Sequence, residues 1–221
     1  MTNPQLIEAP IGGVAVRLRK PPDGSGLHVL MLHGWSGDES VMWVLQSVLP
    51  DDTFLVAPRG IHSLAMGGYQ WSNSPASTQV AFEDFDPAVA ALRTTLNTLR
   101  HSYGFGQTKL LLMGFSQGAA LAFAAARAGI STAGIIALAG FVPHGNVGEL
   151  ESIPVFWGHG THDDLVPVGR AREDVQRLLD ARVEVHFCEA DVGHKLGIEC
   201  THGLKEWLRG HYSDGRKKLQ V

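Results

Sequence analysis

The sequence predicts an α/β protein in which helices cover both faces of a mostly parallel sheet of about seven strands. Short apolar runs alternate with longer segments of helical spacing. Several of these runs are continuous in Val, Leu and Ile, which is typical of strands covered on both faces. No repeat, linker or low-complexity tract divides the 221 residues. We therefore expect one domain over residues 1–221, with a polar tail from about residue 211.

Each expected strand is a short apolar run between polar or glycine-rich segments. The first run, residues 14–18, alternates apolar and polar residues as an edge strand does. This run and the second, residues 28–32, could be antiparallel to each other at the start of the sheet. The strands cover residues 14–18, 28–32, 54–57, 109–113, 134–138, 154–157 and 183–187. Asp86 and Pro87 supply a capping acceptor and a first-turn proline for one helix, and Gly129 ends another. The helices cover residues 86–100, 117–128, 169–180 and 201–209.

The composition excludes some classes of partner. Hydrophobic residues make up 44% of the chain and charged residues 18%, which is typical of a globular protein. There are 18 Lys and Arg against 22 Asp and Glu, a formal net charge of −4, and the basic run lies at residues 216–218. Nucleic acids and anionic membrane surfaces attract clustered positive charge. We therefore expect no nucleic-acid partner and no binding to an anionic membrane surface, which leaves a small molecule as the expected kind of partner.

The start of the chain lacks the basic segment and long apolar core of a secretory signal. The most apolar stretch, residues 119–142, is interrupted by Arg127 and by glycines and serines, so it predicts a helix and a strand rather than a membrane span. We expect a cytoplasmic protein in which Cys188 and Cys200 are free thiols. A bridge between them would clamp the intervening loop, which contains a histidine.

Residues 59–85 form a long connection rich in glycine, serine and aromatic residues. Connections of this length without regular structure often cover a binding site. Met66, Tyr69 and Trp71 in this connection are our tentative substrate-binding residues, since apolar and aromatic side chains line most small-molecule pockets. The alternative is a surface insertion with a short helix, whose large side chains belong to the core.

The segment around Ser116 carries the strongest chemical signal. An apolar strand leads into Gly114-Phe115-Ser116-Gln117-Gly118, and a helix follows directly. This is the G-x-S-x-G pattern in the strand–turn–helix context that it requires. The turn is so sharp that side chains two residues before and after the serine would collide with neighbouring elements. We therefore expect Ser116 to be a nucleophile exposed at the carboxyl end of its strand.

A serine hydroxyl becomes an effective nucleophile only when a base removes its proton. Eleven histidines are present, and His194 stands out because it follows the last expected strand. The loop that contains His194 should therefore lie at the same end of the sheet as Ser116. The adjacent Gly193 would let this loop turn toward the hydroxyl, so we predict that His194 is the base.

A carboxylate must orient that imidazole, and Asp163 and Asp164 lie in the polar loop after the strand at 154–157. The chain order serine, acid, histidine is that of the α/β-hydrolases. Asp163 is our prediction for the acid. Asp164 and Asp191 remain competitors on the basis of position, although Asp191 is close enough to His194 in sequence to shape the same loop.

Acyl transfer also needs backbone N–H groups that stabilise the developing oxyanion. The N–H of Gln117, directly after the nucleophile, is one expected donor. The other is the N–H of Trp35, because the strand at 28–32 ends in a glycine-flanked turn at His33-Gly34-Trp35. We expect His33 itself to organise this loop through hydrogen bonds.

Two rival interpretations involve the same residues. His159, His162, Asp163 and Asp164 are ligand-type residues, but no second cluster is placed to complete a metal site, so we expect no metal. A hydrolase fold that has lost catalysis and binds a ligand is the other alternative. It would be expected to lack the nucleophile, the base or the acid, whereas all three are present here.

Taken together in order, the motifs resemble the phospholipase/carboxylesterase family, small α/β-hydrolases that include acyl-protein thioesterases. The resemblance covers about residues 26–210. The motifs are Leu32-His33-Gly34, Ala57-Pro58-Arg59-Gly60, Gly67-Gly68-Tyr69-Gln70-Trp71, Gly114-Phe115-Ser116-Gln117-Gly118, His159-Gly160 with Asp163, Val166-Pro167, and Gly193-His194. The sequence departs from the family at Ala119, usually glycine, and at Trp35, usually leucine.

The resemblance implies an α/β-hydrolase fold and a catalytic set of Ser116, Asp163 and His194. It places the acid at Asp163 rather than Asp164, and the oxyanion donors at the N–H groups of Trp35 and Gln117. We expect a serine carboxylesterase that acts on short to medium acyl esters and needs no cofactor. Acyl-thioesterase or lysophospholipase activity is the alternative within this fold.

Overall fold

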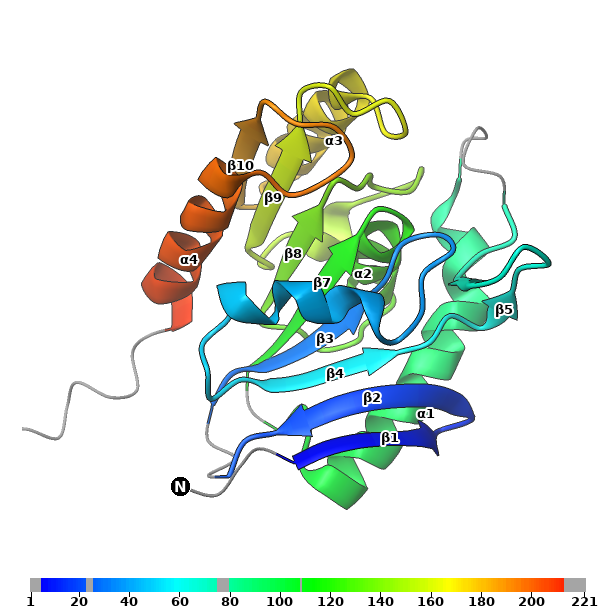
Figure 1. Cartoon of the computed structure of the whole chain (residues 1–221). Helices are drawn as coiled ribbons and strands as arrows, with labels where there is room; N and C mark the ends of the chain where they lie inside the picture. Colours follow the sequence, from blue (N-terminus) through cyan, green and yellow to red (C-terminus); the bar gives the residue numbers. More distant parts are fainter. Residues whose placement is uncertain (1–4, 23–25, 75–79, 108, 213–221) are drawn as a thin grey trace, which may run out of the picture.

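The computed structural model describes residues 5–22, 26–74, 80–107 and 109–212. Its centre is an eight-stranded sheet in the order β1-β2-β4-β3-β7-β8-β9-β10 (Figure 1). These strands are β1 (Gln5–Ile11), β2 (Val14–Lys20), β3 (His28–Leu32), β4 (Phe54–Pro58), β7 (Leu110–Phe115), β8 (Gly134–Leu138), β9 (Val155–Gly160) and β10 (Val185–Ala190). The six neighbouring strands β4, β3, β7, β8, β9 and β10 are parallel, whereas β1 and β2 form an antiparallel hairpin that continues antiparallel onto β4. The antiparallel entry is therefore β1 and β2, and not the expected pair of residues 14–18 with 28–32, which are not neighbours in the sheet.

Helices cover both faces of the sheet (Figure 1). Those longer than one turn are α1 (Asp86–Tyr103), α2 (Gln117–Arg127), α3 (Val168–Asp180), α4 (Ile198–Tyr212) and the 3₁₀ helix η1 (Val41–Val48). Leu30 and Leu32 of β3 belong to the core beneath α1, α2 and α3, while Val29 and Met31 belong to the core beneath η1 and α4. This alternation explains why the strand sequence is continuously apolar.

The parallel arrangement brings four loops to one edge of the sheet. They follow the carboxyl ends of β3, β7, β9 and β10, and they contain the expected oxyanion turn, Ser116, Asp163 and His194, respectively. In an open parallel sheet, this edge is where ligands bind. Residues far apart in the sequence therefore share one side of the molecule.

The predicted α/β architecture and all seven expected strands are confirmed, and the four expected helices are present with bounds that differ by a few residues. The sequence reasoning missed β1, an edge strand that contains Pro10 and turns into β2 through Gly12 and Gly13. Proline has no N–H to donate and is accepted at an edge, where it hides the strand pattern.

The long connection over residues 59–85 contains a small hairpin of β5 (His62–Ser63) and β6 (Tyr69–Gln70), and then the short 3₁₀ helix η2 (Phe82–Phe85). A further 3₁₀ helix, η3, covers Gly148–Leu150. Helix α4 continues to Tyr212, beyond the expected start of the polar tail, and residues 213–221 of that tail lie outside the described part. Within the described residues, the helices are too short or too polar to span a bilayer.

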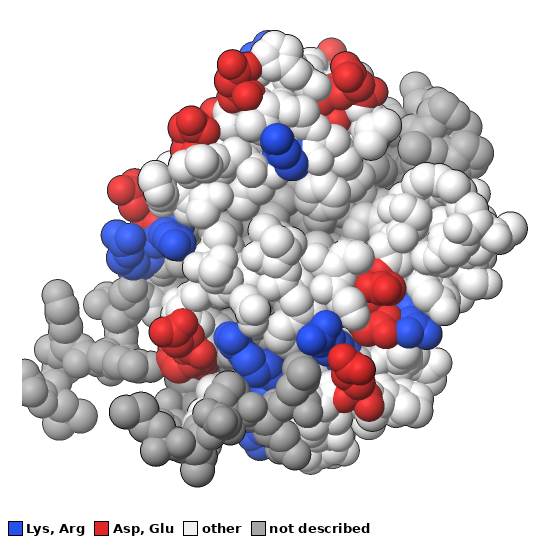
Figure 2. All heavy atoms as spheres, in the orientation of Figure 1, with Lys and Arg blue, Asp and Glu red and all other residues white. Residues whose placement is uncertain are grey.

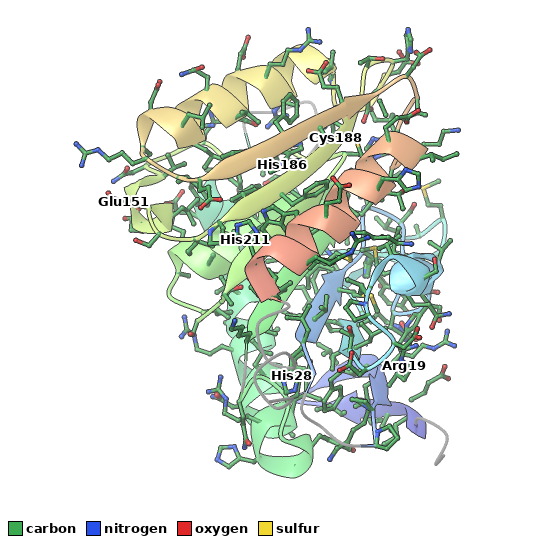
Figure 3. All side chains as sticks on the ribbon, turned by 90° about the vertical axis from the view of Figure 1, so that its left-hand side faces the viewer. Arg19, His28, Glu151, His186, Cys188 and His211 are labelled. Atoms are coloured by element: carbon green, nitrogen blue, oxygen red, sulfur yellow. A yellow bond between two sulfur atoms is a disulfide. The ribbon has the colours of Figure 1, made fainter. Side chains whose placement is uncertain are left out.

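The prediction of free thiols is wrong, because Cys188 and Cys200 form a disulfide. Cys188 lies on β10, against which α4 packs (Figure 3), and Cys200 is fully buried in the first turns of α4. The Cα atoms are 5.5 Å apart. Cysteine composition alone could not reveal this pairing, because it depends on α4 returning along β10. The bridge closes a loop of the chain that contains His194.

Replacing both cysteines, Cys188→Ala and Cys200→Ala, should lower the free energy of unfolding by about 3 kcal/mol, because the bridge restricts the unfolded chain. Urea unfolding followed by circular dichroism measures this change. The oxidised and thiol-reduced wild-type proteins are the matched controls. The reductant should destabilise the wild-type protein and leave the double variant unchanged. Equal stability of the oxidised wild-type protein and the double variant would contradict the prediction.

Candidate active site

Ser116 occupies a strained turn between β7 and α2. Its backbone has φ +53° and ψ −117°, a region that non-glycine residues rarely adopt. The Ser116 N–H donates to the Leu138 carbonyl at the end of β8, 2.9 Å away. A Cβ at Gly118 would overlap the Leu32 carbonyl oxygen, and one at Gly114 would overlap the carbonyl of Gly118. The two glycines therefore allow β3, β7 and α2 to approach closely enough for the turn to form.

Gln117 begins α2, so its backbone N–H belongs to the first turn, where no intrahelical acceptor exists. Its side chain has a role that the sequence did not suggest. The Oε1 atom accepts the Trp71 N–H at 2.9 Å, and Nε2 donates to the Ser72 carbonyl at 3.3 Å. Gln117 thereby ties the segment after β6 to the start of α2.

Asp163 and His194 are in direct contact. The His194 Nδ1 atom lies 2.7 Å from Asp163 Oδ2, and the Asp163 side chain is fully buried. The other oxygen, Oδ1, accepts the N–H groups of Leu165 and Val166, each at 2.9 Å. Because both oxygens are occupied by N–H donors, the carboxylate has one fixed orientation and holds the imidazole in one tautomer.

The competing carboxylates lie elsewhere. Asp164 is exposed, and Asp191 is 2.8 Å from the Nδ1 atom of His162 at the surface. Of the three candidates, Asp163 is therefore the one that the structure joins to His194.

The imidazole of His194 lies beside the elbow. Its ring packs edge-on against Phe115, the residue before Ser116, with the ring centroids 4.9 Å apart. The His194 side chain is 18% exposed, so one side of the ring remains open to a substrate or to water. The structure thus brings the loops after β7, β9 and β10 together as the sequence predicted.

The histidines of the rival metal interpretation have other partners. His159 is buried, with Nδ1 accepting the Trp157 indole N–H at 3.3 Å and Nε2 donating to the Val166 carbonyl at 2.8 Å. Burial lowers the pKa of His159, so the ring is neutral. Among the described residues, no three His, Cys, Asp or Glu side chains are grouped as metal ligands.

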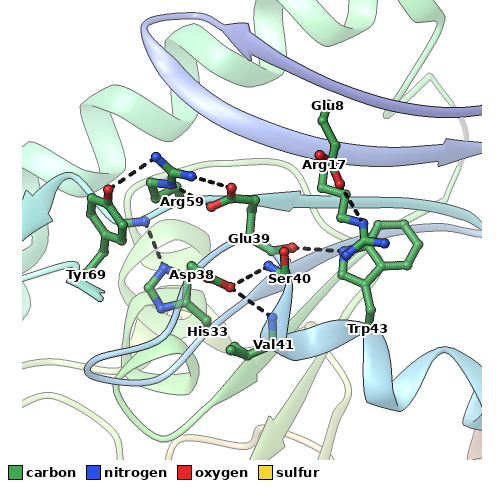
Figure 4. A network of polar contacts seen from close by, with 11 residues as sticks. Glu8, Arg17, His33, Asp38, Glu39, Ser40, Val41, Trp43, Arg59 and Tyr69 are labelled. Carbon is green, nitrogen blue, oxygen red and sulfur yellow. Dashed lines mark hydrogen bonds and ion pairs between the residues drawn. The ribbon is translucent and has the colours of Figure 1, made fainter. Parts of the chain in front are cut away.

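The loop after β3 is organised by His33, as expected. The Gly60 N–H donates to His33 Nε2 at 2.8 Å, the dashed line at the His33 ring in Figure 4. The ring proton is therefore on Nδ1, which donates to the Gly34 carbonyl at 2.7 Å. Burial lowers the pKa of His33 and keeps it neutral. The His33 carbonyl accepts the Trp71 indole N–H at 2.8 Å.

An ion pair that sequence reasoning missed holds the far end of this loop. Both oxygens of Glu39 accept N–H groups of Arg59, at 2.6 and 2.5 Å (Figure 4). The guanidinium also donates to the Tyr69 hydroxyl at 3.2 Å and lies over its ring, 4.6 Å from the centroid. Hydrogen bonding to Arg59 lowers the pKa of Glu39, so the pair is charged. Twenty residues separate the partners, and no local pattern connects them.

The loop after β3 approaches the serine at Gly34. A Cβ on Gly34 would lie 3.3 Å from the Ser116 Cβ, so the backbone at Gly34, the residue before Trp35, abuts the elbow. The indole of Trp35 turns outward, is 52% exposed and donates to Gln70 Oε1 at 3.0 Å. Of the two expected oxyanion donors, Gln117 directly follows Ser116, and Trp35 directly follows Gly34, whose backbone lies against the elbow.

A cavity of about 500 Å³ opens beside the elbow, but the tentative substrate residues do not line it. Trp71 is 1% exposed and packs against the His33 ring, Tyr69 supports Arg59, and Met66 is 75% exposed outside the cavity. The walls come instead from Trp35, η1, Phe115 and the loop after His194. The unusual feature that could have revealed this wall is the apolar sequence of η1, VMWVLQSV.

Known proteins confirm the family resemblance. The family model described as Phospholipase/Carboxylesterase matches residues 19–211. The crystal structure of the Bacillus cereus carboxylesterase is similar, with a TM-score of 0.80 and 22% identity, covering 90% of this chain and 95% of that chain. A carboxylesterase from Mesorhizobium loti has a TM-score of 0.78 and 19% identity, covering 95% and 100%, respectively. Zea mays acyl-protein thioesterase 2 has a TM-score of 0.72 and 19% identity, covering 89% and 98%.

The matched region contains the G-x-S-x-G turn at Ser116 as well as Asp163 and His194, and the sheet has the parallel order of an α/β-hydrolase. The chain therefore belongs to the phospholipase/carboxylesterase family and is a serine hydrolase of the α/β-hydrolase fold.

Proposed function

We propose that this protein is a carboxylesterase in which Ser116 is the nucleophile, His194 the general base and Asp163 the acid that orients it. The observation that carries the proposal is the buried 2.7 Å contact between Asp163 and His194, with the imidazole packed beside the strained elbow at Ser116. A fixed carboxylate stabilises the imidazolium that forms when the serine loses its proton.

In the first half of the reaction, Ser116 Oγ bonds to the ester carbonyl carbon while its proton passes to His194 Nε2. The carbonyl oxygen becomes an oxyanion, which the backbone N–H groups of Trp35 and Gln117 stabilise. Each such donor is typically worth about 2.7–4 kcal/mol in the transition state. The intermediate then expels the alcohol, whose oxygen takes the proton from His194, and leaves an acyl group on Ser116.

In the second half, His194 takes a proton from water as the water oxygen attacks the acyl-enzyme. The new tetrahedral intermediate breaks its bond to Ser116 Oγ, which recovers the proton from His194, and the carboxylic acid leaves. The ionised Glu39–Arg59 pair and the neutral His33 hold the Trp35 loop against the elbow through both halves.

We propose short to medium acyl esters as substrates, because the indole of Trp35 stands at the entrance to the site. Acyl thioesters are the second candidate, supported by the similarity to the Zea mays acyl-protein thioesterase. The cytoplasm stays our proposed location. Alkylation trapping in intact cells tests it: in a reducing cytoplasm Cys188 and Cys200 would be trapped mostly as thiols, whereas trapping in the disulfide form that the structure contains would refute the location.

Ser116→Ala and His194→Ala should each lower kcat by about 10⁴–10⁶-fold, and the double variant should lose little more, because the two groups act as a unit. Hydrolysis of p-nitrophenyl butyrate measures the loss, and circular dichroism checks the fold. A fluorophosphonate probe should label the wild-type protein at Ser116. Retention of most esterase activity by folded Ser116→Ala would refute the mechanism.

Asp163→Asn should lower kcat by about 10⁴-fold, since an amide no longer fixes the His194 tautomer or stabilises its charge. Asp164→Asn, one residue away and exposed, is the matched control and should remain close to the wild-type protein in activity. The reverse order of effects would assign the acid to Asp164.

A series of p-nitrophenyl esters from acetate to palmitate, measured beside the matching acyl thioesters, should show kcat/KM falling at the longest chains. Crowding by Trp35 is the expected cause. Equal values across the series would mean that the site does not distinguish acyl length, and higher values for thioesters would favour the second candidate.

A further inference from the structure

The cavity beside the elbow has walls that neither the proposed mechanism nor the tentative substrate residues account for. It lies between η1 and the loop that joins β10 to α4. Val41, Val44 and Leu45 of η1 form one wall, and Leu196 faces them from the loop after His194. Phe115 and Leu138, at the ends of β7 and β8, form the floor. The size, about 500 Å³, is typical of a small-molecule site.

Several exposed apolar side chains cluster at this cavity. Val44 is 79% exposed, Val41 is 49% exposed and Trp35 is 52% exposed, three of the seven most exposed large apolar side chains among the described residues. Single exposed apolar residues are ordinary, but a cluster at one cavity marks a binding surface. Figure 2 shows the face on which η1 lies as a broad area without charged side chains, with most of the charges toward its edges.

The position of the cavity indicates which half of an ester it accepts. Its wall includes Phe115, whose ring packs against His194, and it includes Lys195 and Leu196, which directly follow His194. In the proposed reaction, His194 must deliver its proton to the departing oxygen, so the alcohol portion lies against the imidazole. A group attached to that oxygen would extend along the loop after His194 and toward η1.

We infer that the cavity between η1 and the β10–α4 loop binds the alcohol portion of the substrate, and that the enzyme selects esters of bulky apolar alcohols such as branched alkyl or benzyl alcohols. This inference rests on the proposed serine esterase function and adds a substrate class to it. Val41, Val44 and Leu196 would contact the alcohol portion. These contacts would affect acylation, the half of the reaction that precedes departure of the alcohol.

Charge at the cavity refines this class. Lys195 is the charged residue among those that line it, and its side chain is exposed at the rim. A cationic group on the alcohol, such as a quaternary ammonium, would be repelled, whereas a carboxylate would be attracted across a solvent-exposed distance. The cavity therefore fits neutral or anionic alcohols better than cationic ones.

The test uses ethyl, butyl and benzyl acetate with the wild-type protein, Val44→Gln and Leu179→Gln. Leu179 is an exposed apolar residue on α3, on the opposite face of the sheet, and serves as the matched control. Val44→Gln should reduce the preference for benzyl over ethyl acetate, measured as the ratio of kcat/KM values, by about tenfold. Leu179→Gln should keep the wild-type ratio. Because Val44 is exposed, loss of folding is not expected, and thermal unfolding verifies this.

A second measurement separates the two halves of the reaction. Every acetate ester forms the same acetyl-enzyme, so the deacylation rate after a burst of p-nitrophenyl acetate should be the same in Val44→Gln and the wild-type protein. If Val44→Gln instead slows deacylation or alters the acyl-length series while keeping the benzyl preference, the cavity binds the acyl portion and the inference is wrong. Absence of a burst and of fluorophosphonate labelling in the wild-type protein would instead refute the esterase function itself.

A third measurement tests the predicted charge preference. Benzyl acetates that carry a para carboxylate or a para quaternary ammonium should differ in kcat/KM by about two- to fivefold in favour of the carboxylate. Lys195→Glu should reverse this order, and Lys195→Gln should remove it. Equal effects of either variant on both substrates would show that Lys195 does not face the alcohol.

Discussion

The passage from β7 into α2 through a single strained residue is the constraint on which the rest of the site depends. A backbone held at φ +53° at Ser116 costs about 1–3 kcal/mol, so the surroundings must favour it. They do so by close approach. Gly114 and Gly118 let the strand, the helix and the end of β3 meet without intervening side chains, and the Ser116 N–H finds an acceptor on β8. The serine stands at the edge of the sheet because the residues two positions before and after it, Gly114 and Gly118, carry no side chains.

The polar groups around this turn are divided into neutral and charged sets with different tasks. The buried histidines His33 and His159 stay neutral and use both ring nitrogens to hold loops. The charged Glu39–Arg59 pair holds a further loop, and both oxygens of Asp163 accept N–H groups, which fixes that side chain. A fixed arrangement of this kind lowers the reorganisation needed when an oxyanion and an imidazolium form, which is the main electrostatic advantage of a preorganised site.

Features encoded locally were predictable from the sequence, and features that arise from packing were not. The elbow at Ser116 has a fixed spacing of small residues, and the parallel order of strands brings Asp163 and His194 to the same edge as the serine. The edge strand β1, by contrast, is disguised by Pro10. The Glu39–Arg59 pair and the cavity wall on η1 depend on how three loops fold against one another. Trp71 is aromatic and near the site, yet it is buried in the core, where its indole N–H donates to the His33 carbonyl. The residue type alone does not show whether a side chain points into a pocket or into the core.

The disulfide also belongs to this second group, and its position on the chain decides what it restrains. Cys188 and Cys200 lie in the last strand and the last helix, 12 positions apart, and β10 forms one edge of the sheet. The bridge is therefore internal to one β–α unit and adds no link between that unit and the other strands. A chain in which either cysteine had oxidised with another partner would lack this covalent restraint on its final strand and helix.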